Sequence, residues 1–143
     1  MDARGDDILS LVRLDAGERI IETLSRYLAG PGRSIRSGFL SGIGAAANCE
    51  IGYYDLQTGQ YSTRVIEESC EITALTGNIA RIDHEPLIHA HITLAGPDFT
   101  VLGGHLVEGT ISVTGEIWIH GASLEVTRRP GDFPGLKLIR FTD

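Results

Sequence analysis

One stretch of this chain, near its N-terminus, has the residue spacing of an amphipathic helix. Its apolar residues recur at i, i+1, i+4, i+7 and i+8, which forms one continuous stripe along a helix. The stripe consists of Ile20, Ile21, Leu24, Tyr27 and Leu28. Asp15, followed three residues later by Glu18, predicts a capping-box start with Asp15 as the N-cap. The segment Gly30-Pro31-Gly32 predicts the end of this helix.

Nearly all of the remaining sequence is typical of short strands separated by turns. We expect strands at residues 8–14, 34–43, 49–55, 61–66, 70–82, 87–94, 105–119, 123–127 and 136–141. Consecutive strands with short turns favour antiparallel pairing, so we predict an α+β fold with a curved, mostly antiparallel sheet and one main helix packed on a face. Glycine makes up 18 of the 143 residues. Many glycines fall inside expected strands, which indicates strong sheet curvature or close packing between subunits.

The bulk properties favour a single globular domain over residues 1–143, with a core from about residue 8 to residue 141. No apolar run approaches the roughly 18 residues of a membrane span, and the acidic N-terminus has no signal-peptide pattern. Cys49 and Cys70 are too few for a disulfide framework and are expected to be reduced, half-buried thiols. These features predict a cytoplasmic protein with no membrane partner.

The net charge of −7 disfavours free-standing DNA binding, because an acidic surface repels the phosphate backbone. The one adjacent basic pair, Arg128-Arg129, is expected to be solvated at the surface. DNA therefore stays a partner that charge disfavours and does not exclude.

Three histidines fall within seventeen residues, in His89-Ala90-His91 and Gly103-Gly104-His105. A spacing of two on a strand places both imidazoles of the first segment on one face. Three clustered neutral imidazoles are good ligands for zinc or another divalent transition metal. The alternative is that they are hydrogen-bonded polar residues of a half-buried sheet. We predict a metal site formed by His89, His91 and His105, with the glycines allowing a close backbone approach.

The geometry of this site depends on the hairpin register. A loop centred on Asp98 would place His91 opposite His105, and all three imidazoles would share a face. A shift of one residue would place His105 opposite Ala90, on the other face. A three-histidine site can also form on a trimer axis, with one histidine from each subunit. The sequence leaves these alternatives open, and we expect His84 and His120 to be structural.

Three histidine ligands leave one tetrahedral position for water, which suits hydrolysis or hydration. Such chemistry needs a nearby acid or base. Glu116 is the candidate, because apolar neighbours allow it to point inward, and Glu108 and Asp98 are further options. A solvated or salt-bridged role is the alternative for each. Whether the chain is an enzyme stays open.

The segment 42–47 matches the glycine pattern of a dinucleotide-binding fingerprint. That fingerprint must open a helix, whereas residues 48–55 favour another strand. We therefore expect a glycine-lined turn between two strands and no dinucleotide cofactor.

Four blocks of this sequence are similar to the PPC (plants and prokaryotes conserved) domain, and the similarity extends over about residues 8–141. The blocks are Ser37-Gly38-Phe39-Leu40-Ser41-Gly42-Ile43-Gly44-Ala45, Leu75-Thr76-Gly77-Asn78-Ile79, His89-Ala90-His91-Ile92 and Gly103-Gly104-His105-Leu106-Val107-Glu108-Gly109-Thr110. The chain lacks the Arg-Gly-Arg core of the AT-hook that precedes the domain in plants, so it resembles the stand-alone prokaryotic type.

This resemblance implies a compact α+β fold and a homotrimer. Some prokaryotic members carry zinc on histidines that correspond to His89, His91 and His105. The resulting expectation is a trimeric zinc-binding protein that is either an enzyme or a binder of a small molecule. The alternative is a DNA-associated regulatory or protein-interaction module, because prokaryotic members are often labelled DNA-binding by analogy.

Overall fold

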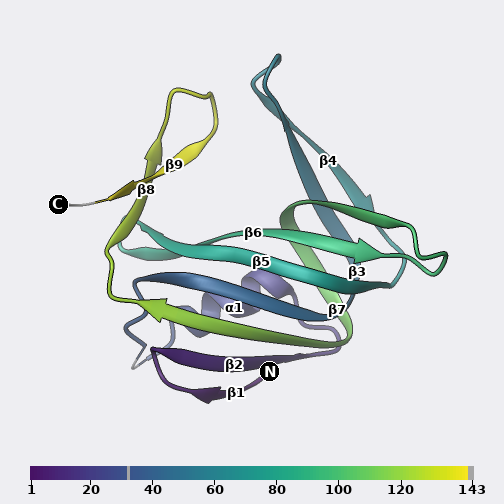
Figure 1. The fold of residues 1–143 in the computed structure, drawn as a ribbon, viewed down its shortest axis with the longest axis horizontal. Coiled ribbons are helices and arrows are strands. Elements are labelled where there is room, and N and C mark those ends of the chain that lie inside the picture. The colour runs from purple at the N-terminus through teal and green to yellow at the C-terminus, as the bar shows by residue number, and fades with distance from the viewer. Residues whose placement is uncertain (32, 142–143) are drawn as a thin grey trace.

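The computed structural model describes residues 1–31 and 33–141, and this part of the chain consists of nine strands and one helix (Figure 1). In chain order the elements are β1 (Asp2–Gly5), β2 (Leu9–Asp15), α1 (Ile20–Leu28), β3 (Ser37–Asp55), β4 (Gln60–Ile66), β5 (Cys70–Ile82), β6 (Glu85–Ala95), β7 (Val101–Ala122), β8 (Val126–Pro130) and β9 (Lys137–Phe141). The α+β class and the mostly antiparallel sheet are confirmed, although sequence patterns missed β1. The pairing of β5 with β8 is parallel, through Arg81 and Thr127.

Four strands form a closed ring within the sheet. Strand β3 pairs with β5 and β7, and β6 pairs with the same two strands. The ring closes because β3 and β7 are 19 and 22 residues long and bend where their register shifts, between Gly44 and Ala46 and again after Ala47. Strands β2 and β1 extend the sheet beyond β7. The predicted curvature is therefore present.

The core lies between this curved sheet and α1. Side chains alternate along the strands, so Val12 and Leu14 of β2 and Ile117 and Ile119 of β7 are buried. The helix packs against β6 and β7 (Figure 1). Its buried residues are Ile20, Thr23, Leu24, Tyr27 and Leu28. Each large apolar side chain buried in this way contributes about 1.5–3 kcal/mol.

The predicted start of the helix was wrong by four residues. The N-cap is Arg19, and its side chain makes no capping hydrogen bond. Asp15 instead ends β2, where its backbone N–H donates to the Glu18 carboxylate at 2.9 Å. The Asp15–Glu18 pair therefore fixes the turn before the helix. The helix ends at Leu28, ahead of the expected glycine segment, in which residue 32 lies outside the described residues.

Strand β3 passes through the segment that matched the dinucleotide fingerprint. The expected turn between residues 43 and 49 was wrong, because the chain continues as one strand with a bulge between Gly42 and Gly44. No helix follows this segment among the described elements, so the prediction that residues 48–55 form a strand and not a helix is confirmed. In residues 1–31 and 33–141 no helix has the length and apolar character needed to cross a bilayer.

Candidate metal centre

Strand β6 presents His89 and His91 on the face that points away from the core. Ala90 between them is buried and 1% exposed, whereas His89 is half-buried and His91 is exposed. The alternation follows from the two-residue period of a strand. The shared face predicted from the spacing is therefore present.

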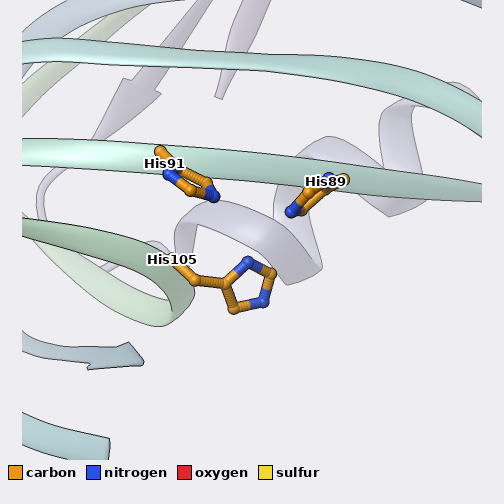
Figure 2. Close-up of side chains that lie close together, drawn as sticks. All are labelled: His89, His91 and His105. Carbon is orange, nitrogen blue, oxygen red and sulfur yellow. The ribbon is translucent and has the colours of Figure 1, made fainter. Parts of the chain in front are cut away.

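The hairpin of β6 and β7 brings His105 to the same place. His91 is paired directly with His105, which is the first of the two registers considered above. The ring centroids of the three histidines are 5.0–5.7 Å apart. One ring nitrogen from each lies within 4.8 Å of the others, and the three rings surround one space (Figure 2). One chain thus gathers all three imidazoles without a contribution from a second subunit.

Glycines make this close arrangement of strands possible. A Cβ on Gly77, which pairs with Ala90, would lie 2.4 Å from the His89 carbonyl oxygen. A Cβ on Gly104 would lie 2.9 Å from the Gly52 carbonyl oxygen. Both distances are shorter than van der Waals contact allows, so a side chain at either position would push apart the strands that hold the histidines.

Burial favours the neutral form of two imidazoles of this cluster, His89 and His105. Desolvation, the nearby Arg128 charge and the other two histidines lower the pKa of His89 to about 4. Desolvation, followed by the charges of His91 and Arg128, also lowers the pKa of His105. Neutral imidazole is the form that binds metal. The His105 Nδ1 atom is buried and has no hydrogen-bond partner, which leaves a nitrogen lone pair or N–H in the cluster without a protein contact.

A pocket of about 380 Å³ opens beside the histidines, a volume suited to a small organic molecule. Tyr61 of β4 lines one side of it, with its ring centroid 5.5 Å from that of His105. Arg128 lines another side and donates from Nη2 to His89 Nδ1 at 2.9 Å. Arg128 was expected to be a solvated surface residue, and that expectation was wrong. Its contact with His89 joins residues 39 positions apart, so no local sequence signal indicated it.

Glu108, considered above as an acid or base, instead caps α1. Its carboxylate accepts hydrogen bonds from the backbone N–H groups of Ile21 at 2.9 Å and Glu22 at 3.1 Å. These donors belong to the first helical turn, whose N–H groups have no partner within the helix. A carboxylate is also favoured there by the helix dipole. Glu108 therefore acts as the helix cap that Arg19 does not supply.

The other candidate residues lie away from the histidine pocket. Glu116 is exposed and lines a different hollow with Ile43 and Val113, so the solvated alternative holds for it and the inward orientation does not. The Asp98 carboxylate accepts hydrogen bonds from Thr100 N at 2.9 Å and Oγ1 at 2.6 Å within the β6–β7 turn. His84 and His120 are exposed and do not join the cluster.

Comparison with known proteins identifies the family. The family sequence model of the Plants and Prokaryotes Conserved (PCC) domain matches residues 1–122. The chain belongs to this family, abbreviated PPC here. No curated protein matches the sequence.

Solved structures of family-like proteins share the fold. A PPC protein from Pyrococcus horikoshii is 30% identical, with a TM-score of 0.84, and the match covers 94% of this chain and 92% of that one. A metal-containing protein from Archaeoglobus fulgidus is 30% identical, with a TM-score of 0.81 and coverage of 93% and 91%. A protein from Bacteroides thetaiotaomicron, named as a candidate DNA-binding protein, is 26% identical, with a TM-score of 0.91 and coverage of 98% and 96%.

Proposed function

We propose that this chain is a homotrimeric PPC-domain protein that binds one zinc ion per chain through His89, His91 and His105. The observation that carries the proposal is the approach of three imidazole nitrogens to within 4.8 Å of one another. Zinc binding would draw these nitrogens closer together, to a Zn–N distance of about 2.0–2.1 Å. The metal-containing relative from Archaeoglobus fulgidus supports the same function.

The donor set fits zinc. Neutral imidazole suits zinc and other late transition ions, and a set of three leaves a tetrahedral site with one open position. Zinc held there would offer that position to a water molecule or a ligand and would act as a Lewis acid. The pocket of about 380 Å³ beside the histidines has room for such a ligand. Since Glu108 and Glu116 lie outside this pocket, we propose ligand binding and assign no acid or base.

Metal analysis of protein purified without a histidine tag tests the proposal. We expect close to one equivalent of zinc per chain, or tight rebinding after chelation. His91→Ala should abolish rebinding, whereas His84→Ala, which changes an exposed histidine outside the cluster, should not. Less than about a tenth of an equivalent, with no rebinding, would contradict the proposal.

The outer face of the sheet supports self-association. Phe39, Ile43 and Trp118 are 52%, 57% and 48% exposed. Because Phe39 pairs with His120 and Ile43 with Glu116, strand alternation places all three apolar side chains on one face. Exposed apolar patches of this kind are typical of interfaces between proteins.

Sedimentation analysis tests the oligomeric state. We expect a trimer for the wild-type chain and a smaller species for Trp118→Lys, because a charge in an apolar interface is costly. A wild-type monomer or dimer would contradict the trimer and leave the metal site unaffected.

DNA association is a second candidate function. The name of the relative from Bacteroides thetaiotaomicron favours it, as does a hollow lined by Arg33, Arg36 and Arg81. Mobility-shift assays should then show complexes whose affinity falls steeply with salt. The absence of a complex at low salt would contradict this function.

A further inference from the structure

The hairpin formed by β8 and β9 completes the histidine pocket. It lies beyond residues 1–122, the segment that matches the family model. It contributes Arg128 from β8, and Leu136, Lys137 and Leu138 from the turn and β9. The Tyr54 hydroxyl donates a hydrogen bond to the Pro134 carbonyl oxygen at 2.9 Å, which ties this hairpin to the β3–β4 hairpin. Side chains outside the matched segment therefore form one wall of the pocket.

The Arg128 contact with His89 is incompatible with a metal on the same imidazole. Arginine is a donor only, so His89 Nδ1 accepts the hydrogen bond from Nη2. A neutral imidazole that accepts at Nδ1 carries its proton on Nε2, and neither nitrogen is then free for an ion. A divalent ion would also be repelled by the adjacent guanidinium. Metal binding to His89 therefore requires Arg128 to release this nitrogen.

The released guanidinium would have a vacant donor edge. Nη2 also donates to Asn78 Oδ1 at 2.9 Å, and Nη1 donates to the Lys137 carbonyl oxygen at 2.8 Å, so the group stays anchored in the pocket. Nε is buried and has no hydrogen-bond partner. Nε and Nη2 share one edge of the guanidinium, and such an edge pairs with a carboxylate through two parallel hydrogen bonds.

The pocket is positively charged in a chain of net charge −7. Arg128 and Lys137 line it, and none of the described residues that line it carries a carboxylate. The rest of the wall is mainly apolar, with Leu87, Leu136 and Leu138 beside Tyr61. An anionic head with an apolar body is the ligand that complements these walls.

We propose that this pocket binds a small carboxylate with an apolar body, which ligates the metal and pairs with Arg128 in place of His89. The inference rests on the proposed metal site and names the ligand class for it. The carboxylate lies between the metal ion and the Arg128 guanidinium and offsets the repulsion between these two cations. The metal and the carboxylate therefore each strengthen the binding of the other. Coupling between two ligands is typically about 5- to 150-fold, and linkage makes it reciprocal.

Zinc titrations with and without butyrate test this inference. In the metal-stripped wild-type protein we expect butyrate to tighten zinc binding by at least about fivefold at equal free zinc. Butyramide, its neutral counterpart, should have no effect, and sulfate should have a smaller effect than butyrate. Arg128→Met should bind zinc more tightly than wild type without butyrate and should lose the enhancement by butyrate.

Two further variants serve as controls. Arg129→Met changes the exposed neighbouring arginine and should behave like wild type. Arg128→Lys keeps the positive charge without the two-pronged donor edge, so it should retain only part of the enhancement and provides a second test if Arg128→Met does not fold.

The outcomes separate this inference from the proposed function. If zinc binds the wild type and butyrate changes nothing, or if Arg128→Met keeps the full enhancement, the carboxylate inference is overturned and the metal site stands. An equal effect of sulfate would overturn the ligand class. If zinc binds neither protein under any condition, the metal site fails and this inference fails with it. If zinc binds Arg128→Met and not the wild type in the absence of butyrate, that result would support the competition between Arg128 and the metal for His89.

Discussion

The N-terminal and C-terminal halves of β7 each contain a histidine and a glutamate, but these residues have different surroundings in the two halves. The first half carries His105, which joins the histidine cluster, and Glu108, which caps α1. The second half carries Glu116 and His120, and both are exposed on the outer face of the sheet. One strand thus places the same pair of residue types in two environments, the first beside the histidine pocket and the helix and the second on the outer face.

Strand partners explain this difference. The first half pairs with β6 and with the C-terminal part of β3, and it faces the histidine pocket and the helix. The second half pairs with β2 and with the N-terminal part of β3. The role of a side chain therefore depends on which neighbours the bent strand gives it, and residue type alone does not decide it.

The largest expected difference between the halves is in metal affinity. His105→Ala removes one of three ligands, so zinc affinity should fall by more than about 100-fold. His120→Ala should leave it unchanged, because that ring packs edge-to-face against Phe39, with centroids 5.0 Å apart, and lies outside the cluster. Competition titration with a chromophoric chelator measures both. Equal losses of zinc affinity in His105→Ala and His120→Ala would show that the two halves of β7 do not differ in metal binding.

The packing of the first half predicts a pH dependence of stability. A Cβ on Gly109 would lie 2.8 Å from Cys49 Sγ, so this strand closely covers the buried thiol. Burial raises the pKa of Cys49 from 9.0 to about 11. The unfolded chain therefore loses this proton at a lower pH than the folded protein. The stabilisation is complete below pH 9 and is lost as the pH rises toward 11.

This contribution should be on the order of 2 kcal/mol. Other groups also titrate above pH 9, so the useful quantity is the difference between wild type and Cys49→Ala. The free energy of unfolding, measured by urea denaturation, should fall more steeply from pH 9 to pH 11 in wild type. Parallel curves for the two proteins would contradict the assigned burial.

The histidine site was predictable because its determinants are local. The period of a strand puts His89 and His91 on one face, and a hairpin centred on Asp98 brings His105 opposite His91. The sequence could not choose between two registers differing by one residue, because that choice depends on how the hairpin packs in the folded protein.

Long-range contacts were beyond sequence reasoning. The cap of α1 comes from Glu108, 87 residues beyond its partner Ile21, so local capping rules pointed to Asp15 instead. Arg128 reaches the site because β8 lies beside β5, where Arg81 pairs with Thr127. Neither of these long-range contacts leaves a periodic pattern in the sequence, because both result from the bending and closure of the sheet.

The smallest expected difference between the halves is in helix capping. Glu108→Ala leaves two N–H groups of the first helical turn without their acceptor, which should reduce the free energy of unfolding by about 1 kcal/mol. Glu116→Ala changes an exposed side chain and should alter it by less than about 0.5 kcal/mol. Zinc affinity should stay within about threefold of wild type in both variants, because neither carboxylate lines the histidine pocket. A loss of zinc binding in Glu108→Ala at unchanged stability would assign this carboxylate to the metal site instead of the helix. Urea denaturation and chelator competition on the same samples distinguish these two roles.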